Sequence, residues 1–143
     1  MGLAAASISS ALPGVLSAEA PAPLLCFTSA VEMAALIRAK KLSAREALAE
    51  HLKQIDRVNP QVNAIVTLIA EQATADAARA DEMQARGETL GPLHGLPVAH
   101  KDLIETAGVR TTYGSPLFKD NVPTHDHLPP EMVYERELLI CRL

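Results

Sequence analysis

Two helix-start signals most restrict the fold of this chain. Ser29-Ala30-Val31-Glu32 and Ser43-Ala44-Arg45-Glu46 each place a serine three residues before a glutamate, which is the pattern of a capping box. The first signal predicts a short helix to about Lys40. The second predicts a longer amphipathic helix that Asn59-Pro60 should end. Its apolar face comprises Ala44, Ala47, Leu48, His51, Leu52 and Ile55, with His51 interpreted as a satisfied core or boundary histidine rather than a ligand.

A β-branched run and an alanine-rich segment follow these helices. Asn63 to Leu68 predicts a short strand, and Ala70 to Arg86 predicts a helix that ends at Gly87. Gly91 to Gly95 has the composition of a turn, and Leu96 to Asp102 should leave it as an extended segment. A stripe of small and apolar side chains lies along the third helix: Ala73, Ala77, Ala80 and Met83. The order helix, helix, strand, helix, strand favours an α/β fold, in which helices cover a sheet.

The composition narrows the classes of function. The chain has 143 residues, of which 48% are hydrophobic but only 3% are aromatic, so aliphatic side chains must build the core. A net charge of -4 without basic clusters argues against nucleic-acid binding. Cys26 and Cys141 lie far apart in sequence and neither has zinc-ligand spacing, which favours reduced thiols in a cytoplasmic protein.

Residues 1–25 form an Ala/Pro-rich leader that we expect to be disordered. A secretory signal is the less favoured interpretation, because no Lys or Arg precedes the apolar run. Pro13 and Gly14 interrupt that run, which is also too short to cross a bilayer. We therefore expect no membrane association.

Lys101 is the candidate catalytic residue. It lies in an otherwise apolar extended segment just after the Gly/Pro turn. A lysine acts as a base only when it is neutral, which burial or a second cation favours. On a strand, Lys101 would face away from His100 and Asp102, which would share a face and could pair. From its position alone, a strand lysine is more often an edge residue with its ammonium in water.

A metal site is the weaker alternative for the polar residues in this half of the chain. The possible ligands are His94, His100, His125, His127, Asp102 and Asp126. The sequence contains no H-E-x-x-H or comparable spacing. We expect neither a bound metal nor a cofactor.

Several segments in the right order resemble the amidase signature family. Gly91 to Asp102 is similar to its G-P-L-x-G-[IL]-P-x-x-x-K-D segment, and Thr111-Thr112-x-Gly114-Ser115 is similar to its [ST]-T-x-G-S continuation. Ser43-Ala44-Arg45-Glu46 and Asn59-Pro60-x-x-Asn63-Ala64 resemble its upstream pattern. The resemblance runs from residue 26 to 127. It implies that these residues provide the N-terminal helices and opening strands of a mixed sheet that is incomplete in this chain.

The resemblance also implies amide hydrolysis by a Ser–Ser–Lys mechanism on a small-molecule amide. A serine attacks the carbonyl, a second serine relays protons, and the lysine at the position of Lys101 acts as the base. The family's serines lie in a downstream Gly/Ser-rich stretch that this sequence does not contain, so only Lys101 carries over. Ser115 has the setting of a turn residue.

Residues 128–143 form a tail that departs from the family pattern. Pro129-Pro130 is foreign to it and the expected strand is absent, which a truncated or frameshifted reading frame would explain. The alternative to an amidase piece is a non-catalytic interaction module, such as a fragment of an amidotransferase subunit that works through its partner.

Overall fold

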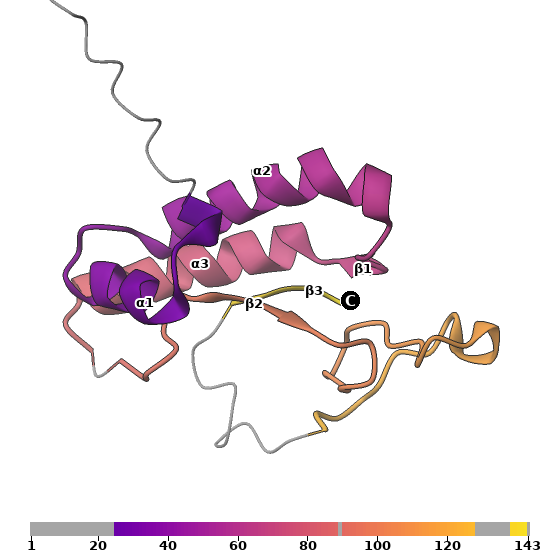
Figure 1. Cartoon of the computed structure of the whole chain (residues 1–143). Coiled ribbons are helices and arrows are strands. Elements are labelled where there is room, and N and C mark those ends of the chain that lie inside the picture. The colour runs from indigo at the N-terminus through magenta and orange to yellow at the C-terminus, as the bar shows by residue number, and fades with distance from the viewer. Residues whose placement is uncertain (1–24, 89, 128–137, 143) are drawn as a thin grey trace, which may run out of the picture.

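The computed structural model describes residues 25–88, 90–127 and 138–142 (Figure 1). The leader up to residue 24 and most of the tail lie outside the described residues. The elements in chain order are η1 (Leu25–Phe27), α1 (Ala30–Arg38), α2 (Ala44–Val62), β1 (Thr67–Leu68), α3 (Ala70–Ala85), β2 (Pro97–His100), η2 (Pro116–Phe118) and β3 (Leu138–Arg142). Helix α2 packs on α3, and α3 packs on the sheet. None of the helices in these ranges is long and apolar enough to cross a membrane.

Both predicted helix starts are confirmed. The Ser29 hydroxyl accepts a hydrogen bond from the Glu32 N–H at 3.2 Å and caps α1. At the start of α2 the capping box is complete. The Ser43 hydroxyl accepts from the Glu46 N–H at 3.1 Å, and the Glu46 carboxylate accepts from the Ser43 N–H at 2.9 Å. These bonds satisfy backbone donors that a helix start otherwise leaves unpaired.

The predicted end of α2 is wrong. The helix continues through Pro60 to Val62 and ends at Asn63, whose φ of 48° is left-handed. Proline lacks an N–H to donate to the preceding turn, but its fixed φ is compatible with a helix. Asn63, predicted to begin a strand, instead caps the helix, because asparagine tolerates the left-handed region better than most residues. The strand that follows is accordingly limited to Thr67–Leu68.

The sheet is mixed, with strand order β1-β3-β2. Strand β3 is antiparallel to β1, where Leu68 pairs with Cys141. It is parallel to β2, where His100 pairs with Arg142, and the register shifts between Val98 and Ala99. The tail was expected to lack a strand, and this expectation is wrong: Leu138–Arg142 occupies the centre of the sheet. Its partners are distant in sequence, so the local pattern of the tail did not reveal the pairing.

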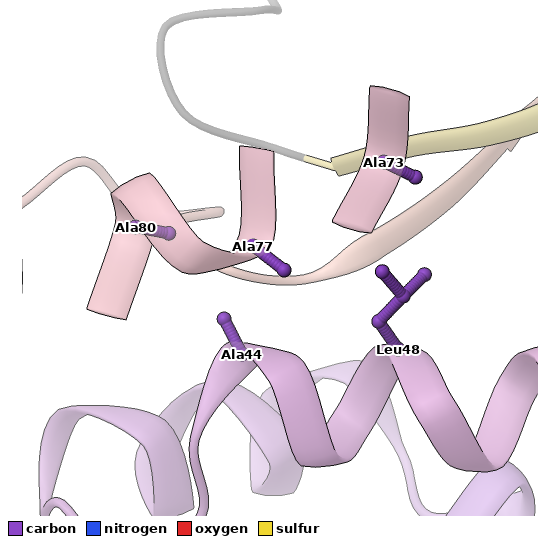
Figure 2. Close-up of a cluster of buried hydrophobic side chains, with 5 residues drawn as sticks. All are labelled: Ala44, Leu48, Ala73, Ala77 and Ala80. Carbon is purple, nitrogen blue, oxygen red and sulfur yellow. The ribbon is translucent and has the colours of Figure 1, made fainter. Parts of the chain in front are cut away.

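Aliphatic side chains build the core, as the composition predicts. One cluster lies between α2 and α3 and consists of Ala44, Leu48, Ala73, Ala77 and Ala80 (Figure 2). Three of the alanines, at 44, 73 and 77, have no exposed surface, which allows the two helices to approach closely. A second cluster joins α1 and α2 to the residue before β2: Met33, Ala34, Ile37, Ala47 and Leu96. Helix α3 ends at Ala85 with Gly87 at φ 73°, close to the predicted boundary.

Candidate functional site

The turn that precedes β2 is fastened to the helices at several points. The Arg38 guanidinium donates to the Pro92 carbonyl at 2.8 Å. His94 is 4% exposed and lies 3.0 Å from the Ala80 carbonyl through Nε2, which must therefore carry the proton. Gly95 has a φ of 73°, and a Cβ there would lie 3.1 Å from the Ala44 Cβ. The strand that leads to Lys101 thus starts from a fixed position.

Lys101 lies directly after β2 and is exposed. Its neighbours His100 and Asp102 are each only 6% exposed. This alternation agrees with the sequence prediction that Lys101 faces away from both. The suggested pairing of His100 with Asp102 stays a prediction.

The buried Asp102 holds a loop that we define as residues 112–114. Asp102 Oδ1 accepts from the Thr112 N–H at 2.9 Å, and Oδ2 accepts from the Thr112 hydroxyl. Oδ2 also lies 3.5 Å from the Gly114 N–H, and the Asp102 carbonyl accepts from the Tyr113 N–H at 3.1 Å. Tyr113 and Gly114 have φ values of 52° and 68°, so the loop turns through the left-handed region.

Lys101 and the 112–114 loop line one pocket of about 370 Å³. The lining residues are Val66, Lys101, Asp102, Leu103, Thr112, Tyr113 and Gly114. The pocket therefore combines one ammonium group with a partly apolar wall. A volume of this size is at the lower end of small-molecule sites.

Glu105 connects this pocket to the residues that were considered as metal ligands. The Tyr113 hydroxyl donates to Glu105 Oε1, and this hydrogen bond raises the pKa of Tyr113 above its ordinary value near 10. His125 Nε2 lies 2.9 Å from Glu105 Oε2. The Asp126 carboxylate accepts from the Ala107 N–H at 2.8 Å, and the His127 N–H donates to the Glu105 carbonyl at 3.0 Å.

The His125–His127 segment is thus tied to residues 105–107 by two hydrogen bonds from backbone N–H groups and by the contact between His125 and Glu105. Across residues 25–88, 90–127 and 138–142, no group of three or more His, Cys, Asp or Glu side chains is arranged to hold a metal ion. The histidine at 51 packs at the boundary of the core, where Nδ1 lies 2.8 Å from the Ala47 carbonyl.

The serines in the described part of the chain act as helix caps. Ser29 and Ser43 start α1 and α2, and the Ser115 hydroxyl accepts from the Leu117 N–H at 3.3 Å at the start of η2. The turn interpretation of Ser115 agrees with this position. The hydrogen bonds of Asp102 to the 112–114 loop were not predicted from the sequence. The sequence held one signal for these hydrogen bonds. Asp102 follows Lys101 directly, and the pair Thr111-Thr112 comes soon after it, with Thr112 ten residues beyond Asp102.

Comparison with known proteins places these observations in a family. The Amidase family model matches residues 46–131. The acylamidase of Rhodococcus erythropolis is 44% identical over 100 residues, covering 70% of this chain and 21% of the relative. A glutamyl-tRNA(Gln) amidotransferase subunit of Synechococcus sp. (strain CC9605) is 41% identical over 99 residues, covering 69% and 20%. The solved structure of a bacterial aryl acylamidase of the amidase signature enzymes has a TM-score of 0.74 and 28% identity, covering 85% of this chain and 26% of that one.

The fold matches part of a solved amidase-signature enzyme, and the chain belongs to the amidase signature family. It spans about a fifth of the length of the curated relatives it matches.

Proposed function

We propose that Lys101 is the base of a Ser–Ser–Lys amide hydrolysis, carried out together with serines that the 143 residues do not supply. The observation that supports this role most strongly is the position of Lys101 in a pocket whose wall is fixed by its neighbour. Both carboxylate oxygens of Asp102 accept hydrogen bonds from the 112–114 loop. Lys101 itself is exposed here, so the burial that favours a neutral lysine would have to come, like the serines, from the rest of a complete family protein. A serine hydroxyl needs such a base to become an effective nucleophile.

The substrate class that we propose is a small acyl amide. The relative from Rhodococcus erythropolis carries the name acylamidase, and the aryl acylamidase structure shares the fold of this chain. The pocket beside Lys101 is partly apolar, since Val66 and Leu103 contribute to its wall. An apolar acyl group would fit such a wall better than a charged one.

A second candidate is the corresponding piece of an amidotransferase subunit, which would work through a partner protein. Its support is the 41% identity to the glutamyl-tRNA(Gln) amidotransferase subunit. The two candidates differ in the fate of the amide nitrogen: an amidase releases it as a free amine or ammonia while water takes the acyl group, whereas an amidotransferase passes the nitrogen to a second substrate. One assay distinguishes the two candidate functions. An amidase consumes a free amide with water alone, whereas the amidotransferase piece would need its partner for turnover.

A chimera tests the role of Lys101. Residues 26–127 of this chain would replace the matching segment of the Rhodococcus erythropolis acylamidase. We expect the chimera to hydrolyse simple aryl amides, and Lys101→Met to reduce kcat/KM by about 10²–10⁴-fold, the usual contribution of a positioned base. Lys119→Met is the matched control, because Lys119 is also exposed and contacts only the exposed Asp120 among the ion pairs of the described residues.

The 143-residue chain alone should show no turnover, because the three described serines serve as caps and the sequence has no Gly/Ser-rich stretch. An active chimera that keeps its rate in Lys101→Met would refute the proposed role. Loss of the rate in both lysine variants would point to a folding defect, which circular dichroism would identify.

A further inference from the structure

The burial of the Asp102 carboxylate and the hydrogen bonds that it accepts from a neighbouring loop together point to a role beyond folding. Its carboxylate is buried, and burying a charged group is unfavourable unless hydrogen bonds compensate. Three donors on Thr112 and Gly114 provide part of that compensation. Hydrogen bonds to an ionised acceptor are among the stronger ones in proteins. The buried carboxylate therefore contributes to holding one short loop.

The 112–114 loop has a few contacts besides those with Asp102, among them an edge-to-face contact of the Tyr113 ring with Phe118 at 5.2 Å between ring centroids. One hydrogen bond closes it locally, from the Ser115 N–H to the Thr112 carbonyl at 2.9 Å. Tyr113 is a non-glycine residue at φ 52°, a conformation that surrounding contacts must stabilise. Asp102 provides such contacts on one side of the loop, and the bond from Tyr113 to Glu105 provides one on the other.

Lys101 immediately precedes Asp102 in the chain, and Asp102 is the residue that holds this loop. Asp102 cannot shift without moving the Lys101 backbone, and the loop that it holds forms a wall of the pocket around Lys101. We propose that Asp102 is a positioning residue, whose clamp on Thr112 and Gly114 fixes the location of the Lys101 ammonium relative to the pocket. This inference rests on the proposed function of Lys101, but the placement itself is measurable without catalysis.

The first arm of the test uses the full 143-residue chain and needs no activity. In Asp102→Asn, amide hydrogen exchange at Thr112 and Gly114 should accelerate by at least about tenfold, because each loses or weakens a bond to a charged acceptor. The amides of Gly108 and Thr111 serve as internal controls, since they donate to the Pro123 and Asn121 carbonyls at 2.9 and 3.0 Å. The NMR signal of isotopically methylated Lys101 should move or broaden, while that of Lys119 stays in place.

The second arm uses the chimera described above. Asp102→Asn should lower kcat by about tenfold or more and leave KM within about twofold, because the lysine acts on the nucleophile rather than holding the substrate. Thr112→Val removes only the hydroxyl and should give a smaller loss in the same direction. Asp120→Asn is the matched control, since it makes the same chemical change at an exposed carboxylate. Thr112→Val also keeps the test valid if Asp102→Asn fails to fold.

Each outcome either supports or overturns the positioning role of Asp102. Unchanged exchange at Thr112 and Gly114 would overturn the clamp. Faster exchange with an unmoved Lys101 signal would show that the clamp is only structural and would overturn the positioning role. If the chimera's rate proves independent of Lys101, the proposed function fails, and the Lys101 signal alone then decides whether Asp102 places that side chain.

Discussion

The Asp81 carboxylate on α3 accepts a 2.7 Å hydrogen bond from the backbone N–H of Ala44, the first residue of α2. Its other oxygen accepts from the Arg45 Nε at 2.8 Å. A helix start carries unpaired N–H groups and the positive end of the helix dipole, so an anion is favourable there. Helix α2 is thus capped by its own Ser43 and again by a neighbouring helix. This second cap joins α2 and α3 at the end where their alanine contacts begin.

Removing this inter-helix cap should destabilise the chain. Asp81→Ala leaves the N–H of the fully buried Ala44 without its acceptor, which should lower the free energy of unfolding by about 1–3 kcal/mol. Asp76→Ala is the control: it lies on the same helix and forms an (i, i+3) ion pair with the exposed Arg79. That pair should contribute about 0–1 kcal/mol. Urea unfolding of both variants measures the difference, and equal losses would contradict the role of Asp81.

Gly95 and Gly108 make a matched pair for testing the turn before β2. Their φ values are 73° and 76°, so an alanine is strained to a similar extent at both. A Cβ at Gly95 would lie 3.1 Å from the Ala44 Cβ, whereas nothing lies within 4 Å at Gly108. Gly95→Ala should therefore cost about 1–3 kcal/mol more than Gly108→Ala, the range for overpacking a dense core. Thermal unfolding compares the two. If Gly95→Ala and Gly108→Ala lose the same stability, the turn accommodates the added Cβ, which would contradict tight packing at Gly95.

The features that the sequence predicted well are those whose causes are local. A capping box needs residues three positions apart, and the starts of α1 and α2 follow directly from Ser29 and Ser43. The buried alanine stripe of α3 follows from helical periodicity. Lys101 was singled out by resemblance rather than by its pattern, since a lone lysine in an extended segment is not specific.

The features that the sequence did not predict depend on distant partners. Asp81 caps a helix that begins 37 residues earlier. Strand β3 is defined by pairing with β1 and β2, and no local signal in the tail specifies either partner. Pro60 was expected to end α2, but the Asn63 cap and the Asn59 side chain, which accepts from the Ile65 N–H at 2.9 Å, place the end later.

Glu46 should make a defined contribution to the pH dependence of stability. Hydrogen bonds from the Ser43 N–H and hydroxyl hold the pKa of Glu46 below its ordinary value near 4.5. A depressed folded-state pKa stabilises the fold fully above the unfolded-state value, and this stabilisation is lost as the pH falls through the folded-state pKa. Glu46→Gln should therefore lower the thermal midpoint near neutral pH and lose less stability on acidification. Parallel profiles of the two proteins below about pH 5 would contradict this assignment.

The central strand of the sheet comes from the tail, and removing it should leave the rest of the chain with exposed apolar surface. Without β3, both β1 and β2 would lose their ladder partner, because in the described sheet each pairs only with β3. At a net value of about 0.5–1.5 kcal/mol for each backbone hydrogen bond, losing a few of them should cost about 2–5 kcal/mol.

Two independent changes can remove the strand: ending the chain at His127, or Cys141→Pro, which deletes a backbone N–H from the middle of the ladder. Both should broaden the thermal transition and increase the binding of a dye that reports exposed apolar surface, while the helical signal of α2 and α3 largely persists. A sharp melt at the original midpoint in both variants would show that the helices and the Lys101 pocket are stable without the tail.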